Sequence, residues 1–194
     1  MEKPVRIGCL VMAAGNGERF GSNKLAMELD GKSLLQRSFE AVPKELFSAV
    51  TVVTQYAQAE QLAAQFGFAA IHNAHPDRGI SHTIALGTKA MYDCDGILYL
   101  VSDQPLLSRG TVARIVETWK KHPDRIVGAG HDGVRGNPNL FPRCYFDELL
   151  ALQGDHGGNT VIRLHEQKLL LVETRKEELT DCDTPEALEA LKRA

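Results

Sequence analysis

Short apolar runs alternate with helix-spaced apolar residues along most of the chain. Continuous runs of apolar and β-branched residues predict buried strands, and apolar residues three and four positions apart predict amphipathic helices. The predicted strands cover residues 7–13, 49–54, 68–73, 96–102, 125–131 and 168–174. The predicted helices cover residues 33–42, 57–66, 82–91, 110–121, 145–152 and 185–194. This alternation favours an α/β/α domain of three layers with a mostly parallel sheet.

The glycine- and proline-containing stretch 128–139 (GAGHDGVRGNPN) departs from this alternation. We interpret it as a functional loop or a hairpin connection, not as a domain boundary. The sequence contains no internal repeat, low-complexity tract or linker, and a single domain over residues 1–194 is expected for this length.

Composition narrows the class of protein. Hydrophobic residues make up 43% and charged residues 24%, which excludes a disordered or collagen-like chain. The net charge of −3 disfavours nucleic acid or a polybasic membrane contact as a partner. No apolar run approaches the roughly 20 residues of a transmembrane helix, and the first run breaks at Gly15 too soon for a signal peptide. We therefore expect a cytoplasmic protein.

The cysteine and histidine residues give no strong metal signal. The four cysteines are scattered, with no CxxC pair, and are expected to be buried or free thiols: Cys9, Cys94, Cys144 and Cys182. His72 and His75 could chelate a metal, but a loop position explains them with fewer assumptions.

A glycine-containing segment follows the first predicted strand, at the edge where open α/β sheets bind ligands. Its small residues let the backbone approach an anion with the N–H groups pointing inward, and its two cations add positive charge. We predict that the following residues bind the triphosphate of a nucleotide: Ala13, Ala14, Gly15, Asn16, Gly17, Arg19 and Lys24.

Two common phosphate-binding motifs do not fit this segment. The P-loop pattern is absent, and the GxGxxG pattern fails because Gly21 comes one place late. The second predicted strand also ends in VVTQ without an acidic residue, which disfavours an NAD-binding module. The pattern AAGxGxRFGxxK fits residues 13–24 throughout, whereas a merely flexible turn would require neither Arg19 nor Lys24.

The segment VMAAGNGERFGSNKL resembles the signature of MobA-like nucleotidyltransferases and, within them, of molybdenum cofactor cytidylyltransferases. Further landmarks follow in the expected order over nearly the whole chain: HPDRGISHTIALG (75–87), LVSDQPLL (100–107), GNPNLF (136–141) with GDHGGN (154–159), and TDCDTPEAL (180–188). The resemblance implies a Rossmann-like nucleotidyltransferase fold.

Two aspartates are candidate metal ligands. Asp103 ends an apolar strand, where a carboxylate can ligate Mg²⁺ or can instead form a turn. The resemblance implies that Asp103 is the magnesium ligand and that Asp183 is a second one. The residues after Asp183 also suit a helix start, with Thr184 as the N-cap and Pro185 in the first turn.

Two further segments carry candidate binding residues. Gly79, Ser81 and Thr83 precede or open a predicted helix, and the resemblance implies that this segment recognises the base; plain N-capping by Ser81 is the alternative. The resemblance also places Asn137, Asp155 and Gly157 at the acceptor. There Asn137 replaces the usual histidine and Asn159 stands where an arginine often lies, so a titrating group is lost at position 137.

The resemblance implies a Mg²⁺-dependent enzyme that transfers CMP from CTP to the terminal phosphate of a molybdopterin-type cofactor and releases pyrophosphate. Asp103, Arg19 and Lys24 are the expected catalytic residues, and Ala13-Ala14-Gly15 sides with cytidylyl rather than guanylyl members. The alternatives are GTP or another phosphorylated acceptor with the same fold, and a non-catalytic maturation or insertion factor for the cofactor. A molybdoenzyme apoprotein is a further expected partner.

Overall fold

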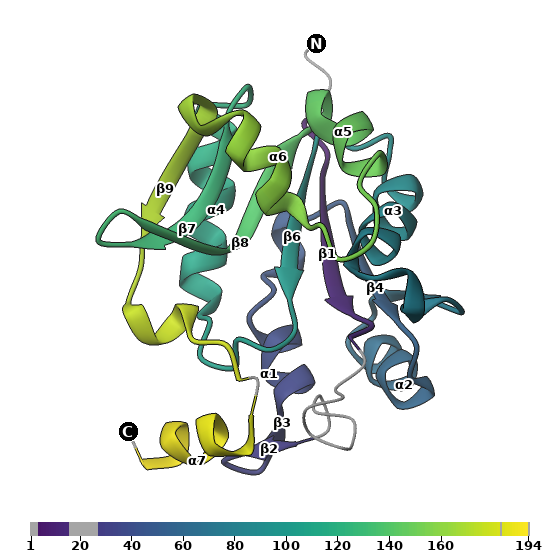
Figure 1. Ribbon diagram of the computed structural model, residues 1–194, viewed down its shortest axis with the longest axis vertical. Coiled ribbons are helices and arrows are strands. Elements are labelled where there is room, and N and C mark those ends of the chain that lie inside the picture. The colour runs from purple at the N-terminus through teal and green to yellow at the C-terminus, as the bar shows by residue number, and fades with distance from the viewer. Residues whose placement is uncertain (1–3, 16–26, 183, 194) are drawn as a thin grey trace.

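The computed structural model describes residues 4–15, 27–182 and 184–193 (Figure 1). Its main sheet has seven strands in the order β5-β4-β1-β6-β8-β7-β9. The strands are β1 (Ile7–Ala13), β4 (Ala49–Thr54), β5 (Ala69–His72), β6 (Gly96–Val101), β7 (Ile126–His131), β8 (Val134–Pro142) and β9 (Leu169–Glu173). Only the pairs of β8 with β6 and β7 are antiparallel among these described strands, which confirms the mostly parallel sheet.

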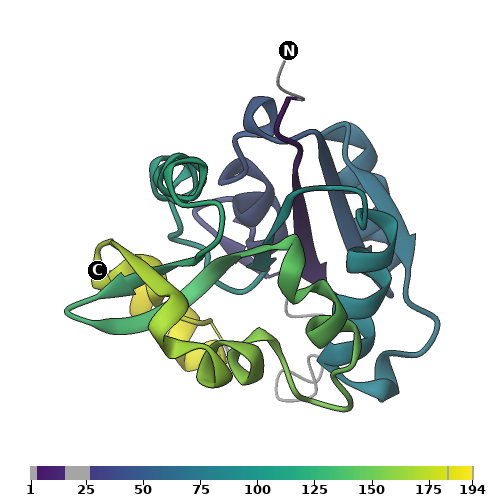
Figure 2. The ribbon, with the colours of Figure 1, turned by 90° about the horizontal axis from the view of Figure 1, so that it is seen from above.

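Helices cover both faces of the sheet, as Figures 1 and 2 show. On one face α1 (Leu34–Glu40), α2 (Ala57–Gln65) and α4 (Arg109–Lys121) share a core with Val11 of β1. On the other face α3 (Ile80–Ala90), α5 (Phe146–Leu150) and α6 (Gly158–Leu164) share a second core with Leu10. Neighbouring residues of a strand point to opposite faces, so β1 contributes to both cores. The three predicted layers are confirmed.

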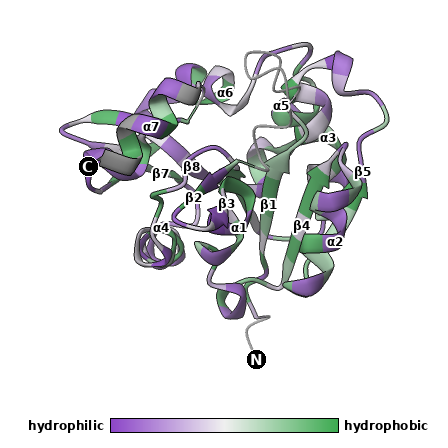
Figure 3. Ribbon diagram, turned by 90° about the horizontal axis from the view of Figure 1, so that it is seen from below, coloured by the Kyte–Doolittle hydropathy of each residue, from purple (hydrophilic) through white to green (hydrophobic). Residues whose placement is uncertain are grey.

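The central strands are apolar because neither face of the sheet meets water. β1 is buried at six of its seven positions and β4 at five of its six, and both are largely hydrophobic in Figure 3. A strand covered on both sides loses the alternation of polar and apolar residues. This is the reason why these strands could be predicted from continuous apolar runs.

The stretch 128–139 contains a hairpin connection, but much of it is strand. β7 and β8 are joined at Asp132 and Gly133, which both have positive φ (48° and 75°), as tight hairpin turns require. β8 then continues to Pro142, through a cis peptide bond between Asn137 and Pro138. The sequence prediction missed this strand because its first half is polar and contains proline.

The C-terminal helix α7 (Pro185–Arg193) closes a third apolar cluster. Leu188 packs there with Cys182, Leu34 and Leu29, the last from the short hairpin β2 (Glu28–Leu29) and β3 (Lys32–Ser33). The predicted helix start is confirmed, because the Thr184 hydroxyl accepts a hydrogen bond from the Ala187 N–H at 3.2 Å. The last helix therefore packs beside the hairpin that follows residues 16–26 (Figure 1).

Within the described ranges, five short 3₁₀ helices connect these elements: η3 (Lys44–Leu46), η4 (Pro76–Arg78), η5 (Arg143–Tyr145), η6 (Glu166–Lys168) and η7 (Lys176–Leu179). Over the described residues, no helix has the length and apolar character needed to cross a membrane. The four cysteines are free thiols, and three of them are buried.

Candidate active site

The carboxyl ends of β1 and β6 bring two of the predicted site segments together. The two strands pair in parallel with Met12 opposite Val101, so the residues that follow them leave the sheet side by side. The Ser102 hydroxyl donates to the Met12 carbonyl oxygen at 2.8 Å and fixes this junction. Ala14 and Gly15, the described residues of the glycine-containing segment that follow β1, therefore lie with Asp103 at one edge of the sheet.

Side chains at the carboxyl end of β4 hold the start of the glycine-containing segment from its other side. Three consecutive side chains donate to three consecutive carbonyl oxygens: Thr54 Oγ1 to Ala13 (2.9 Å), Gln55 Nε2 to Ala14 (2.9 Å) and Tyr56 OH to Gly15 (2.9 Å). The side chain of Ala13 is fully buried in the core, Ala14 is 6% exposed and Gly15 is exposed. The remaining predicted residues of this segment, Asn16, Gly17, Arg19 and Lys24, lie outside the described residues.

Asp103 is half-buried in the turn after β6, where its carboxylate is an oxygen donor of the kind that Mg²⁺ prefers. Its carbonyl oxygen accepts the Cys182 N–H at 2.8 Å. The next residue, Gln104, is buried and donates to Asp181 Oδ1 at 3.0 Å. These contacts hold the segment that leads to Asp183 against the Asp103 turn, while Asp183 itself is outside the described residues. The donor type at Asp103 fits a hard divalent cation.

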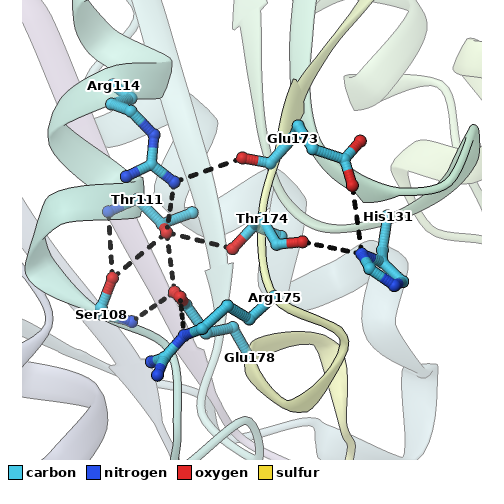
Figure 4. Close-up of polar contacts among 8 residues, drawn as sticks. All are labelled: Ser108, Thr111, Arg114, His131, Glu173, Thr174, Arg175 and Glu178. Carbon is cyan, nitrogen blue, oxygen red and sulfur yellow. Dashed lines mark hydrogen bonds and ion pairs between the residues drawn. The ribbon is translucent and has the colours of Figure 1, made fainter.

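A buried carboxylate, Glu178, anchors the same C-terminal segment to the start of α4 (Figure 4). Glu178 is 3% exposed and accepts hydrogen bonds from the Ser108 N–H (2.9 Å), Thr111 Oγ1 (2.7 Å) and Arg175 Nε (3.1 Å). Burial raises the pKa of Glu178, but the hydrogen bonds outweigh this effect and the pKa is lowered from its ordinary value. The anchoring role of Glu178 was not predicted from the sequence, because nothing in a glutamate's local sequence shows that the side chain is buried.

A second group of possible metal ligands lies two strands away. His131, Asp132 and Glu173 place one ligand atom each within 4.8 Å of one another. His131 Nδ1 is already 3.1 Å from Glu173 and 2.9 Å from the Thr174 carbonyl oxygen (Figure 4). These interactions explain the cluster without an ion, and two of its three residues are exposed.

The predicted base-binding segment is held against the loop around Gly154. Gly79 has a φ of 79°, and a Cβ there would lie 2.4 Å from the Gly154 carbonyl oxygen, so only glycine fits. The Ser81 N–H donates to the same oxygen at 3.1 Å. Ser81 and Thr83 are both buried, and the N-cap of α3 is Gly79, so capping by the Ser81 side chain is wrong.

A cavity of about 270 Å³ opens beside the β1–β6 edge and collects the predicted acceptor residues. Met12 and Val101 form part of its wall. Its polar lining comes from β8 and from the loop and helix around α6: Asn137, Asn139, Asp155, His156, Gly157, Asn159, Thr160 and Arg163. Asn139 Nδ2 donates to Asn137 Oδ1 at 3.0 Å, which engages one end of the Asn137 amide.

The structure thus joins Asn137 to Asp155 and Gly157 although they are far apart in the chain. His156 and Arg163 line the same cavity and were missed by the sequence analysis. Arg163 lies in α6, which the sequence prediction also missed, because α6 is short and opens with Gly158 and Asn159. A helix prediction over GNTVIRL would have placed Asn159 and Arg163 on one face.

Comparison with known proteins decides the family of the chain. The model of the MobA-like NTP transferase domain matches residues 9–169. The chain belongs to this family. It is accordingly a nucleotidyltransferase, and the resemblance to MobA-like nucleotidyltransferases is confirmed.

Curated relatives of this MobA-like nucleotidyltransferase carry different names. The purine catabolism protein PucB of Bacillus subtilis is 28% identical over 100% of this chain and 99% of its own length. A molybdenum cofactor guanylyltransferase of Shewanella sp. (strain MR-4) is 28% identical over 69% of this chain and 66% of its own.

Solved structures share the fold at low identity. A nucleotidyl transferase from Methanothermobacter thermautotroptrophicus superimposes with a TM-score of 0.81 at 21% identity, over 97% of this chain and 96% of that one. Rv0371c from Mycobacterium tuberculosis superimposes with a TM-score of 0.80 at 20% identity, over 100% of both chains. These likenesses show the Rossmann-like nucleotidyltransferase fold.

Proposed function

We propose that this MobA-like nucleotidyltransferase transfers CMP from CTP to the terminal phosphate of a molybdopterin-type cofactor. The observation that carries the proposal is the arrangement at the carboxyl ends of β1 and β6. The backbone of Ala14 and Gly15 lies there beside the Asp103 turn, and the cavity of Asn137 and Asp155 opens next to both. A donor nucleotide and a phosphorylated acceptor can therefore meet at one edge of the sheet.

In this proposal the acceptor phosphate attacks the α-phosphorus of CTP in line. A bond forms between an acceptor phosphate oxygen and the α-phosphorus, and the bond to the β-phosphate oxygen breaks, so pyrophosphate leaves. The attacking phosphate is already anionic at neutral pH, and no residue has to remove a proton from it. The work left to the protein is positioning and charge stabilisation.

Asp103 would hold Mg²⁺, with Asp183 as a second ligand, and the bound ion would neutralise charge on the phosphates. The amides of Ala14 and Gly15 would bind phosphate oxygens, as amides do in other anion-binding loops. Arg19 and Lys24 would add cations to the triphosphate. The segment from Gly79 to Thr83 would contact the nucleotide through its backbone, since the side chains of Ser81 and Thr83 are buried.

GTP is the second candidate donor. Two kinds of observation point in different directions: Ala13-Ala14-Gly15 resembles cytidylyl members, whereas three relatives are named as molybdenum cofactor guanylyltransferases, one of them as a probable one. The side chain of Ala13 is fully buried, so any contact of a side chain with the base would have to come from Ala14. The name of PucB specifies neither a nucleotide nor an acceptor.

Pyrophosphate release with each nucleotide tests the proposal. The purified protein is given CTP or GTP, Mg²⁺ and a molybdopterin-type acceptor, in molybdenum-loaded and metal-free forms. Acceptor-dependent release of pyrophosphate from CTP is expected. Release from GTP but not from CTP would make GTP the donor nucleotide. Release with a different phosphorylated acceptor only would overturn the molybdopterin assignment, and release with none would favour a binding or insertion factor.

Arg163 is the proposed contact of the acceptor phosphate. Among the described residues that line the cavity, no other residue is a lysine or an arginine. Arg163 lies one helical turn beyond Asn159 on the same face of α6. A guanidinium binds phosphate with two parallel hydrogen bonds. Arg163 can therefore supply the positive charge that Asn159 does not.

Arg163→Gln is expected to raise the KM for the acceptor about 10-fold, as loss of one charged hydrogen bond predicts. The KM for the nucleotide should stay within about twofold. Steady-state kinetics with each substrate varied in turn measures both. Arg125→Gln is the matched control, because Arg125 precedes β7 at the opposite edge of the sheet. An unchanged acceptor KM in Arg163→Gln would contradict this contact.

A further inference from the structure

The last side chain of β4 and the two that follow it form a set of donors to the first part of the nucleotide-binding segment. The Thr54 hydroxyl, the Gln55 amide and the Tyr56 hydroxyl each reach the carbonyl oxygen of one residue, from Ala13 to Gly15. All three donor–acceptor distances are 2.9 Å. The set is itself fixed, because the Tyr56 N–H donates to Thr54 Oγ1 at 3.1 Å and the Tyr56 carbonyl oxygen accepts the Ala59 and Glu60 N–H groups of α2.

These contacts fix the direction of the peptide N–H groups. In a trans peptide the N–H points away from the carbonyl oxygen of the preceding residue. The carbonyl oxygens of Ala13 and Ala14 face the side chains of Thr54 and Gln55. The N–H groups of Ala14 and Gly15 therefore point away from β4. β1 lies between β4 and β6, so the side away from β4 is the side of Asp103.

Two further features suit this arrangement to an anion. A hydrogen bond to a carbonyl oxygen polarises the peptide and makes its N–H a stronger donor. The space at Gly15 is also open, because a Cβ there would meet no described atom within 4 Å. A phosphate group can therefore approach the backbone closely at this residue.

We infer that Thr54 and Gln55 are positioning residues: by holding the carbonyl oxygens of Ala13 and Ala14, they orient the Ala14 and Gly15 N–H groups toward the triphosphate of the donor nucleotide. Tyr56 holds the carbonyl oxygen of Gly15 and so supports the position of that residue, not the direction of either N–H group. The inference rests on the proposed function for the location of the triphosphate. It assigns a role to side chains that do not themselves reach the phosphates. Thr54 is fully buried at the end of β4 and its hydroxyl also accepts the Tyr56 N–H, so Gln55 offers the cleaner test.

Gln55→Met removes the amide donor to the Ala14 carbonyl oxygen and keeps the length of the side chain. We expect it to weaken the binding of Mg·CTP and of inorganic triphosphate about 3- to 10-fold, the usual effect of one lost hydrogen bond. The KM for CTP should rise by the same factor while the acceptor KM stays unchanged, and the melting temperature should match the wild type. Isothermal titration with both probes, steady-state kinetics and thermal unfolding measure these quantities.

Tyr92→Phe is the control for the loss of one side-chain hydrogen bond, since the Tyr92 hydroxyl donates to Asp147 at 2.8 Å, away from this edge. Wild-type affinity for triphosphate in Gln55→Met would overturn the inference while leaving the proposed function intact. If Gln55→Met lowers the melting temperature, Gln55→Leu decides, with weaker triphosphate binding expected and unchanged binding contradicting the role. A wild-type protein that binds neither probe would overturn both the proposed function and this inference.

Discussion

Asp103→Asn is expected to lower kcat/KM for nucleotide transfer by about 10³-fold or more, while the fold is retained. The substitution keeps the size of the side chain but removes the charge that would hold Mg²⁺. A metal ion contributes several kcal/mol of charge stabilisation in a transition state, and each 1.36 kcal/mol is about tenfold in rate. Activity at several Mg²⁺ concentrations, with thermal unfolding of the same sample, measures the effect.

Asp132→Asn is the control for this experiment. Asp132 belongs to the second cluster of potential ligands, its side chain is 86% exposed, and asparagine tolerates its positive φ. We expect the activity of Asp132→Asn to match that of the wild type. Magnesium-dependent activity that survives in Asp103→Asn but falls in Asp132→Asn would move the metal to the hairpin and contradict the assignment.

Glu178→Gln is expected to lower the free energy of unfolding by about 2–3 kcal/mol, because hydrogen bonds to a buried charged group are lost or reversed. An amide has one acceptor oxygen, whereas the carboxylate accepts from Ser108, Thr111 and Arg175. In a domain of this size the change corresponds to a fall of roughly 4–12 °C in Tm. Chemical denaturation at pH 7 measures the free energy directly.

The pH dependence of this difference follows from the lowered pKa of Glu178. A carboxyl group with a lower pKa in the folded state adds stability above its unfolded pKa and loses it as the pH falls through its folded pKa. The advantage of the wild type over Glu178→Gln should therefore be full at pH 7 and shrink below about pH 4.5. Glu177→Gln, an exposed neighbour on η7, is the control and should change little. Equal stability of both variants would refute the anchoring role.

The sequence predicted the parallel part of the fold because local pattern and tertiary environment agree there. Strands 7–13 and 49–54 were predicted with the bounds that β1 and β4 have. The prediction missed β8 because its first half is polar and its buried half, up to Pro142, pairs with the distant strand β6. Pairing of β8 with β6 and β7 overrides a weak local preference for strand.

The candidate site could be predicted only where a residue type indicates its own chemistry. The carboxylate of Asp103 after an apolar strand indicates a metal ligand. The small residues Ala14 and Gly15 after β1 indicate a backbone that can bind phosphate. Gln55 and Glu178 carry no such local signal, because their roles arise from contacts 41 and 70 residues away in the chain. Side chains that act through the backbone of another segment become visible only in three dimensions.

A crystal structure with CTP and Mg²⁺ tests the central claim most directly. The account predicts phosphate oxygens within hydrogen-bonding distance of the Ala14 and Gly15 N–H groups, and a magnesium ion bound to an Asp103 carboxylate oxygen. A triphosphate bound elsewhere, or an ion that contacts the phosphates without Asp103, would contradict it.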